Sequence, residues 1–220
     1  MKLGDIMTLI GVVLIVISLI VFFVYNPIYI SPTPLVISIP TPSPPTPMPI
    51  SIEAGWEPQT YGDSQGITAV HPEEDQLVLQ AHLIDGDPNY SQGNIYLDLR
   101  SAYVPDLMGK VPINMVGKEI SVLVKVPNDF ADDPSHPNGV QVFVKDSDWK
   151  SQYGPWKNIK WANTWITITL SPTTGEIPTG YTEKGFDPTD IIMIGVKFEM
   201  GTGSNAKYDG PLYVKDMYLC

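Results

Sequence analysis

The sequence predicts an all-β domain of the sandwich or barrel class, preceded by one transmembrane helix and a proline-rich stalk. Three observations predict this organisation: an apolar run near the N-terminus, a tract dense in proline, and then short segments in which apolar and polar residues alternate. Beyond the apolar run, no segment has a sustained apolar repeat with helical spacing. We therefore expect a membrane anchor in residues 1–25, a linker in residues 26–52 and a globular domain in residues 53–220.

The apolar run extends from Ile6 to Tyr25 and is broken only by single Thr, Gly and Ser residues. About 20 helical residues span a hydrocarbon core of roughly 30 Å. A cleaved signal peptide is the alternative, but it would have a shorter apolar region followed by a small-residue cleavage site, which this sequence lacks. Lys2 precedes the run and no Lys or Arg follows until Arg100. The positive-inside rule therefore predicts a single-pass cell-membrane protein whose C-terminal domain is extracellular.

The linker contains nine of the 22 prolines, between Asn26 and Ile52. Proline has no backbone N–H and a fixed φ, so we expect an extended polyproline II conformation and no part in a sheet. Such a segment is a semi-rigid spacer between the membrane and the domain. Binding of the tract to an aromatic-lined groove of another protein is the alternative role.

Seven segments of the domain show the alternation of a half-buried strand, with turn residues between them. Val140, Val142 and Val144, for example, alternate with a more polar set. One face of each such strand is available for a core, which is typical of a sandwich or barrel. The predicted strands are Gln76–His82, Asn94–Leu99, Glu119–Val126, Val140–Lys145, Trp165–Leu170, Ile191–Glu199 and Leu212–Leu219.

The charge balance narrows the range of partners. The chain has 13 Lys and Arg against 24 Asp and Glu, a net charge of −11. This balance repels nucleic acid and anionic lipid, and no basic cluster in the sequence offsets it, so we expect no nucleic-acid partner. The only cysteine, Cys220, cannot form a disulfide within the chain, and pairing with another chain stays open.

The sequence contains no recognisable catalytic motif. His71 and His136 each precede a proline and are expected in turns, and no histidine has the spacing of a zinc site. Acidic pairs such as Asp146 and Asp148 are the residue type that glycoside hydrolysis uses. In a chain this acidic, however, carboxylates in turns are usually solvated surface. We therefore predict that the protein is not an enzyme.

Aromatic residues gather after the predicted strand that ends at Lys145, where four of the five tryptophans lie. Trp149, Tyr153 and Trp156 occur in a segment rich in polar residues, Gly and Pro, which we expect to be a loop without a core of its own. Aromatic rings beside polar groups suit sugars, because the C–H face of a pyranose packs on a ring while polar groups bond its hydroxyls. The alternative is that the rings cap the end of the core, and for Trp165 we expect a core position.

Several segments resemble, in the same order, the β-jelly-roll (galactose-binding-like) carbohydrate-binding modules attached to bacterial mannanases and related glycan-degrading enzymes. They are Val140–Asp146, Gly154–Trp156, Trp165–Leu170, Gly185–Thr189, Ile194–Phe198 and Gly210–Leu219. The resemblance spans nearly all of residues 52–219 and implies a β-sandwich jelly roll. The segment Tyr213–Asp216 departs from the family pattern, since it keeps only the second of two acidic positions.

The resemblance also implies a structural calcium ion, Ca²⁺, that joins the first and last strands. By position its acidic ligands would be Glu53 and Asp216, with backbone carbonyls completing an oxygen shell. The alternative is that both are ordinary surface acids.

In many relatives the ligand lies on the concave face of one sheet. If the three valines of Val140–Lys145 face the core, Gln141 faces the other way, and Lys197 does so on the strand Ile191–Glu199. We therefore expect carbohydrate to contact Gln141 and Lys197 on the floor of a groove, with Trp149, Tyr153 and Trp156 at its rim.

The predicted function is a membrane-anchored, non-catalytic extracellular module that binds neutral β-linked polysaccharide. A surface glycan-degrading enzyme is an open second partner. One alternative is a structural or adhesive cell-surface protein that uses the jelly roll for protein contacts, which should then expose a large apolar patch. A small hydrolase is another, and it requires a pair of carboxylates in a cleft.

Overall fold

The computed structural model describes residues 14–15, 47–127, 130, 137–159, 163–203 and 206–220. The chain divides into two compact units, Met1–Ser43 and Pro44–Cys220. In the first unit only Leu14 and Ile15 are described, and both are helical. The predicted membrane helix and most of the predicted stalk thus lie outside the described residues. Within the part of the chain that is described, no helix has the length and apolar character needed to cross a bilayer.

The described part of the second unit is built mainly from strands, and a short 3₁₀ helix spans Pro105–Leu107. The described strands are β1 (Met48–Ile50), β2 (Glu57–Pro58), β3 (Ile67–Glu73), β4 (Gln76–Ile84), β5 (Gln92–Asp98), β6 (Ile120–Lys125), β7 (Gly139–Asp146), β8 (Ser151–Tyr153), β9 (Lys157–Asn158), β10 (Ile166–Leu170), β11 (Tyr181–Thr182), β12 (Ile191–Glu199) and β13 (Lys207–Leu219). Each of the seven predicted strands is therefore present, with bounds that differ mainly at the ends.

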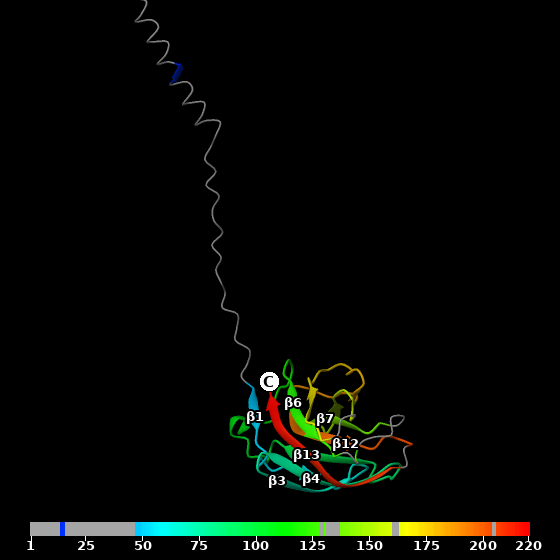
Figure 1. Cartoon of the computed structure of the whole chain (residues 1–220). Coiled ribbons are helices and arrows are strands. Elements are labelled where there is room, and N and C mark those ends of the chain that lie inside the picture. The colour runs from blue at the N-terminus through cyan, green and yellow to red at the C-terminus, as the bar shows by residue number, and fades with distance from the viewer. Residues whose placement is uncertain (1–13, 16–46, 128–129, 131–136, 160–162, 204–205) are drawn as a thin grey trace, which may run out of the picture. The chain divides into compact units, whose positions relative to one another are not determined.

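The strands form two antiparallel sheets packed as a sandwich (Figure 1). The six-stranded sheet has the order β10-β6-β13-β4-β3, and β1 also pairs with β13. The seven-stranded sheet has the order β11-β8-β7-β12-β5-β2, and β9 also pairs with β7. From β4 to β7, and again from β10 through β12 to β13, the chain alternates between the sheets, which is the connection pattern of a jelly roll. The expected all-β sandwich is confirmed.

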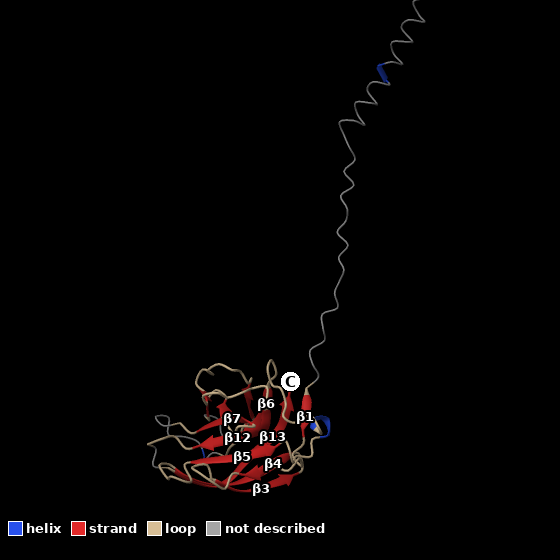
Figure 2. Cartoon of the chain, turned by 180° about the vertical axis from the view of Figure 1, so that it is seen from behind, coloured by secondary structure: helices blue, strands red, loops and turns tan. Residues whose placement is uncertain are grey.

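The core lies between the two sheets, and strand alternation decides what enters it. In the seven-stranded sheet, β7 and β12 run side by side (Figure 2), with Val142 opposite Val196 in the register. The residues two positions away along each strand face the same way. Full burial of one such side chain contributes about 1.5–3 kcal/mol. The core side chains from these two strands include Val140, Val142, Val144, Ile194, Val196 and Phe198, all at most 1% exposed.

The first strand departs from the sequence prediction. The linker was expected to stay out of the sheets, but β1 pairs with the end of β13, with Pro49 opposite Tyr218. Among the described strands β1 pairs with β13 alone, and on an edge strand the missing N–H of a proline is tolerated. Ile50 is buried in the main core, so apolar packing holds the segment in place. The folded domain therefore starts before Glu53.

Three local predictions were wrong. His71 lies within β3 and not in a turn. The segment between Trp149 and Trp156 is not one continuous loop, because it contains the strand β8. Trp165 is only half-buried and lies outside the core, because the pairing of Ile166 with Val124 turns the preceding residue to the outer face of the six-stranded sheet.

Candidate functional site

A row of aromatic residues crosses the outer face of the seven-stranded sheet, the face turned away from the core. Tyr153 is the register partner of both Tyr181 and Phe143, and Gly195 is the partner of both Phe143 and Tyr96. Cross-strand partners in a sheet point to the same face, so these residues form one line across β11, β8, β7, β12 and β5. We call Tyr181, Tyr153, Phe143 and Tyr96 the aromatic row.

Gly195 allows this row to be continuous. A Cβ atom there would lie 2.3 Å from Cζ of Phe143 and 2.5 Å from the backbone oxygen of Ile95. The Phe143 ring therefore lies across the strand β12, where any other residue would displace it. On the other side, the rings of Phe143 and Tyr153 have centroids 5.4 Å apart, and those of Tyr153 and Tyr181 are 6.4 Å apart. These separations are typical of favourable aromatic pairs.

Lys197 stands beside the aromatic row and links it to Trp156. Its Nζ atom lies 5.0 Å from the centroid of the Tyr153 ring and 5.7 Å from that of Trp156, within the range of cation–π attraction. The same ammonium group is 2.7 Å from a carboxylate oxygen of Glu199, so its charge is paired. Trp156 packs over Gly139, where a Cβ atom would lie 2.0 Å from its ring.

Two hydroxyl groups of the row, those of Tyr153 and Tyr96, have a raised pKa and keep their protons at neutral pH. Burial raises the pKa of Tyr153 to about 12. Burial, and then the hydrogen bond that its hydroxyl donates to Glu57 over 3.1 Å, raises the pKa of Tyr96 to about 12 as well. The face therefore presents neutral phenols beside apolar ring surfaces.

Two amide side chains lie beneath Lys197, which pairs in register with both Gln141 and Asn94. Gln141 is 5% exposed, and its Nε2 donates to the backbone oxygen of Gly154 over 2.8 Å. Asn94 donates to Gln59 over 3.2 Å, but its own oxygen is buried without a partner among the described residues. An unpaired buried acceptor costs about 1–3 kcal/mol.

At the other end of β7, Trp149 is 48% exposed and pairs with Arg100, whose guanidinium carbon is 5.2 Å from the ring centroid. Arg100 donates two hydrogen bonds, of 2.9 and 2.6 Å, to Asp98, and these bonds hold the pKa of that carboxyl below its usual value. Next to this pair is a cavity of about 400 Å³. It is lined by Leu99, Arg100, Ser101, Ala102, Tyr103, Leu107, Met108, Gly109 and Val111.

The cavity adjoins the outer face of the seven-stranded sheet. Val111, which lines the cavity, also packs against a small apolar cluster of Phe143, Ile192 and Met193. Val111 also packs against the main core, to which Leu99 and Leu107 of the cavity lining belong, so the cavity lies where the core and the outer cluster meet. Tryptophans flank β7 at both ends, with Trp156 over Gly139 and Trp149 beyond Asp146.

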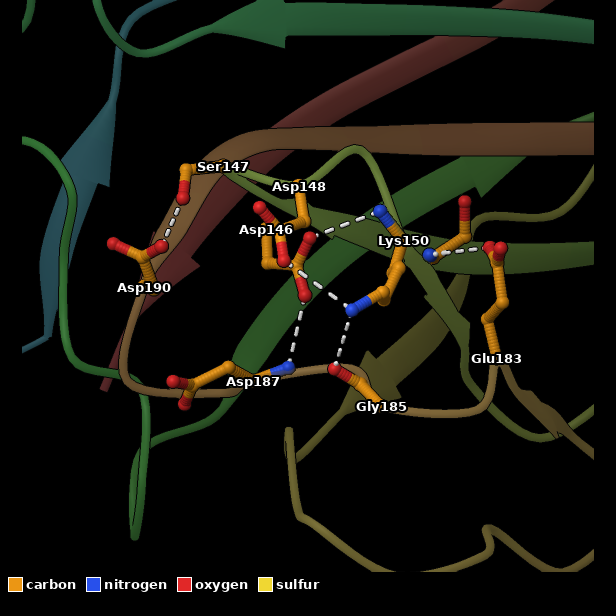
Figure 3. Close-up of polar contacts among 9 residues, drawn as sticks. Asp146, Ser147, Asp148, Lys150, Glu183, Gly185, Asp187 and Asp190 are labelled. Carbon is orange, nitrogen blue, oxygen red and sulfur yellow. Dashed lines mark hydrogen bonds and ion pairs between the residues drawn. The ribbon is translucent and has the colours of Figure 1, made fainter.

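A buried carboxylate holds the loop that carries Trp149 (Figure 3). Asp146 is 1% exposed, and its two oxygens accept backbone hydrogen bonds from Lys150 and Asp187, both at 2.9 Å. Lys150 in turn donates to the backbone oxygen of Gly185 over 3.1 Å. The network thus joins the β7–β8 turn to residues 183–190. It fixes Trp149 in the left-handed region, with φ of 65°, which a non-glycine residue adopts only when its surroundings impose it.

The structure brings together three of the five residues predicted to contact carbohydrate. Tyr153, Trp156 and Lys197 form one cluster, with Gln141 beneath it in an internal hydrogen bond. Trp149 stands apart, near the opposite end of β7. Sequence reasoning missed Tyr96 and Tyr181, because nothing in their own segments indicates that the register aligns them with Phe143 and Tyr153.

The two residues predicted to bind calcium lie in neighbouring segments, because Ile50 pairs with Met217. Both carboxylates are exposed, and Asp216 lies at a β-bulge with φ of 49°. The described part of the chain contains no group of three or more His, Cys, Asp and Glu residues arranged for a metal ion. Glu53 and Asp216 would therefore need backbone carbonyls for most of an oxygen shell, and calcium stays a prediction.

Comparison with known proteins identifies no family for the chain. No family model matches the sequence, and no curated protein matches it. The similar solved structures include the CBM22-1 xylan-binding domain of Xyn10C from Paenibacillus barcinonensis, with 13% identity and a TM-score of 0.39, covering 79% of this chain and 93% of that one. A structure described as "CBM4 structure and function" has 12% identity and a TM-score of 0.40, covering 76% and 94%.

The structure of PfGH50B is also similar, with 12% identity and a TM-score of 0.46. The alignment covers 77% of this chain but only 22% of that one. The structural neighbours are thus carbohydrate-binding jelly-roll modules and glycoside hydrolases.

Replacing Asp146 tests the carboxylate network. In Asp146→Asn, the amide oxygen can accept from only one of the two N–H groups, and the amide nitrogen faces the other. We expect the free energy of unfolding to fall by about 2–3 kcal/mol, measured by chemical denaturation. Asp148→Asn is the matched control: its side chain is 75% exposed, so its loss should cost less than about 0.5 kcal/mol. Equal effects of the two changes would contradict the role given to Asp146.

Calcium binding is tested by melting the full-length protein with calcium and with chelator. An ion held only by the folded state raises the melting temperature by mass action, and the Glu53→Gln/Asp216→Asn double variant should lose this increase. A wild-type melting curve that is the same in both conditions would rule out the site.

Proposed function

We propose that this chain is a non-catalytic module, anchored to the outer surface of a membrane, that binds neutral β-linked polysaccharide on the outer face of its seven-stranded sheet. The observation on which the proposal rests is the aromatic row, with Lys197 and Trp156 beside it. Flat apolar rings next to neutral hydroxyl groups suit a pyranose, which offers C–H faces and hydroxyls to the same surface.

The charges on this face favour a neutral ligand. Lys197 is paired with Glu199, and Arg100 is paired with Asp98. Burial lowers the pKa of Lys145, whose register partners on the neighbouring strands are Ser151 and Met193. A charged sugar would have to compete with these existing ion pairs, whereas a neutral sugar can use the phenols without breaking them.

The length of the face favours an extended chain over a single sugar. Trp156 lies over the first residue of β7, and Trp149 follows three residues after its last. At about 3.3 Å per residue, the strand between them extends roughly 25 Å. Several consecutive sugar units are needed to contact both tryptophans.

The carboxyl groups near the face favour binding over hydrolysis. A glycosidase needs one carboxylic acid whose pKa is raised so that it can protonate the leaving group. The pKa values of the Asp98 and Asp187 carboxyl groups are lowered, chiefly by hydrogen bonds from Arg100 and Thr189, which is opposite to the shift of such an acid. Glu57 accepts a hydrogen bond from Tyr96, and Glu183 accepts one from the backbone of Ser151.

A second candidate function is adhesion through protein contacts. It is favoured by exposed apolar side chains in the connection between β5 and β6, where Tyr103 is 69% exposed, Met108 63% and Val116 56%. An interface of that kind would use the loop, not the aromatic row, so the two candidates depend on different residues.

Tyr181→Ala and Trp156→Ala test the polysaccharide site in the full-length protein. Tyr181 is 58% exposed, so its loss should leave the melting temperature nearly unchanged while weakening the binding of β-linked gluco-, xylo- or manno-oligosaccharides about threefold to tenfold. Trp156→Ala should lower the affinity for the same oligosaccharides about tenfold. Calorimetric titration measures both effects.

Tyr213→Ala is the matched control, because this tyrosine lies on the other sheet and should leave the affinity for neutral oligosaccharides unchanged. Wild-type protein that binds none of these oligosaccharides, or Tyr181 and Trp156 variants that bind as well as wild type, would contradict the proposed site. If Tyr103→Ala and Met108→Ala then abolished binding to a protein partner, adhesion would replace polysaccharide binding as the proposed function.

The membrane anchor is tested by fractionation. We expect the full-length protein to stay with membranes after a carbonate wash, because the apolar run from Ile6 to Tyr25 is long enough to span the bilayer. Protease added outside the cell should release the domain by cutting in residues 26–46. Recovery of a soluble form that begins near Asn26 would show that the run is a cleaved signal peptide instead.

A further inference from the structure

The outer face of the six-stranded sheet carries a second group of aromatic residues, in which lysines lie between the rings. Lys125 of β6 is the register partner of Tyr213 on β13. Val124 pairs with Ile166 of β10, so the next residues outward, Lys125 and Trp165, are neighbours on the outer face. We call Trp165, Lys125, Tyr213 and Lys215 the lysine–aromatic patch.

The rings and ammonium groups of this patch are in direct contact. The Nζ atom of Lys125 lies 4.8 Å from the ring centroid of Trp165 and 4.4 Å from that of Tyr213. The Nζ atom of Lys215 lies 4.7 Å from the Trp165 centroid. Each distance falls within the range of cation–π attraction, and each of the four side chains is half-buried. The two lysines are therefore held against the sheet surface.

Among the described residues, little negative charge compensates the positive charge of the patch. Within that part of the chain Lys215 has one carboxylate partner, Asp75, at 3.3 Å, and that side chain is 73% exposed, so the pair contributes little. Lys125 forms no ion pair with another described residue. Because both Nζ atoms lie within 5 Å of the same ring, they stand within about one Debye length of each other and repel. A bound anion would relieve this repulsion.

The two outer faces of the sandwich thus differ in charge. Beside the aromatic row, Lys197 is neutralised by Glu199 and is 12% exposed. In the lysine–aromatic patch, Lys125 and Lys215 both contact the ring of Trp165. Among the described residues, their only ion pair is the weak one between Lys215 and Asp75. Of the two faces, only the lysine–aromatic patch offers both ammonium groups for a carboxylate and aromatic rings for the apolar side of a sugar ring.

We propose that the lysine–aromatic patch binds acidic polysaccharide, in which uronic acid units supply the carboxylate. The carboxylate would accept hydrogen bonds from Lys125 and Lys215, while the sugar ring packs against Trp165 and Tyr213. Nucleic acid needs a longer track of basic residues, and anionic membranes attract clusters of several Lys and Arg, whereas this patch offers two lysines beside two rings, which suits a carboxylate on a sugar ring. This site is independent of the neutral-polysaccharide face.

The test compares wild type with the Lys125→Gln/Lys215→Gln double variant in the full-length protein, using oligogalacturonate and oligomannuronate as probes. We expect wild type to bind at least one of them, more weakly as salt is added. The double variant should lose about tenfold or more in affinity, because two charge-assisted hydrogen bonds are removed. Its affinity for neutral oligosaccharides should not change.

Two controls separate this site from a general effect of charge and from the neutral face. Lys118→Gln/Lys184→Gln removes the same two charges from exposed loop positions and should alter uronate affinity less than about twofold. Tyr181→Ala should leave uronate binding intact while weakening neutral binding. The proposal is overturned if wild type binds no uronate, if both lysine pairs have the same effect, or if single-stranded DNA or phosphatidylserine vesicles bind the patch and uronate does not.

Discussion

The pairing of β7 with β12 is the constraint on which the rest of the molecule depends. Gly195 faces Phe143 in this register, and the ring occupies the space where any side chain at position 195 would be. A slip of one residue would place a valine under the ring and turn the core residues of a whole strand to solvent. The same register sets Lys197 beside Gln141. This antiparallel pair therefore sets the core residues of both strands and the centre of the aromatic row, which the pairings of β7 with β8 and of β12 with β5 extend to Tyr153 and Tyr96.

The same alternation of apolar and polar residues occurs in both sheets, but their two outer faces differ. In each sheet the apolar residues of the alternation face inward, and the residues between them form an outer face with aromatic rings and lysines. What differs is the acidic partner: Glu199 stands two positions from Lys197 on the same strand, whereas Lys125 has rings on both sides. The charge of Lys197 is therefore paired, whereas the charge of Lys125 is held against two aromatic rings.

The buried carboxylate of Asp146 joins the β7–β8 turn to the loop before β12. Burying a carboxylate is costly unless its oxygens are hydrogen-bonded, and Asp146 meets this requirement with two backbone N–H groups from separate loops. The free energy of these two hydrogen bonds also offsets the unfavourable left-handed backbone conformation of Trp149. The position of this tryptophan at the end of the sheet is thus a property of the network and not of its own segment.

The sequence by itself determined the class of the fold, the seven principal strands and the region rich in aromatic residues. Alternation of apolar and polar residues is a local property, and it states which side chains share a face of one strand. It also predicted correctly that Gln141 and Lys197 face away from the core. Only the tertiary structure decided that Tyr96 and Tyr181 extend the aromatic row, that Trp149 stands apart from Trp156, and that Trp165 lies outside the core. The physical reason is that neighbouring strands and their registers are set by contacts between residues far apart in the chain, and no pattern within a single strand encodes them.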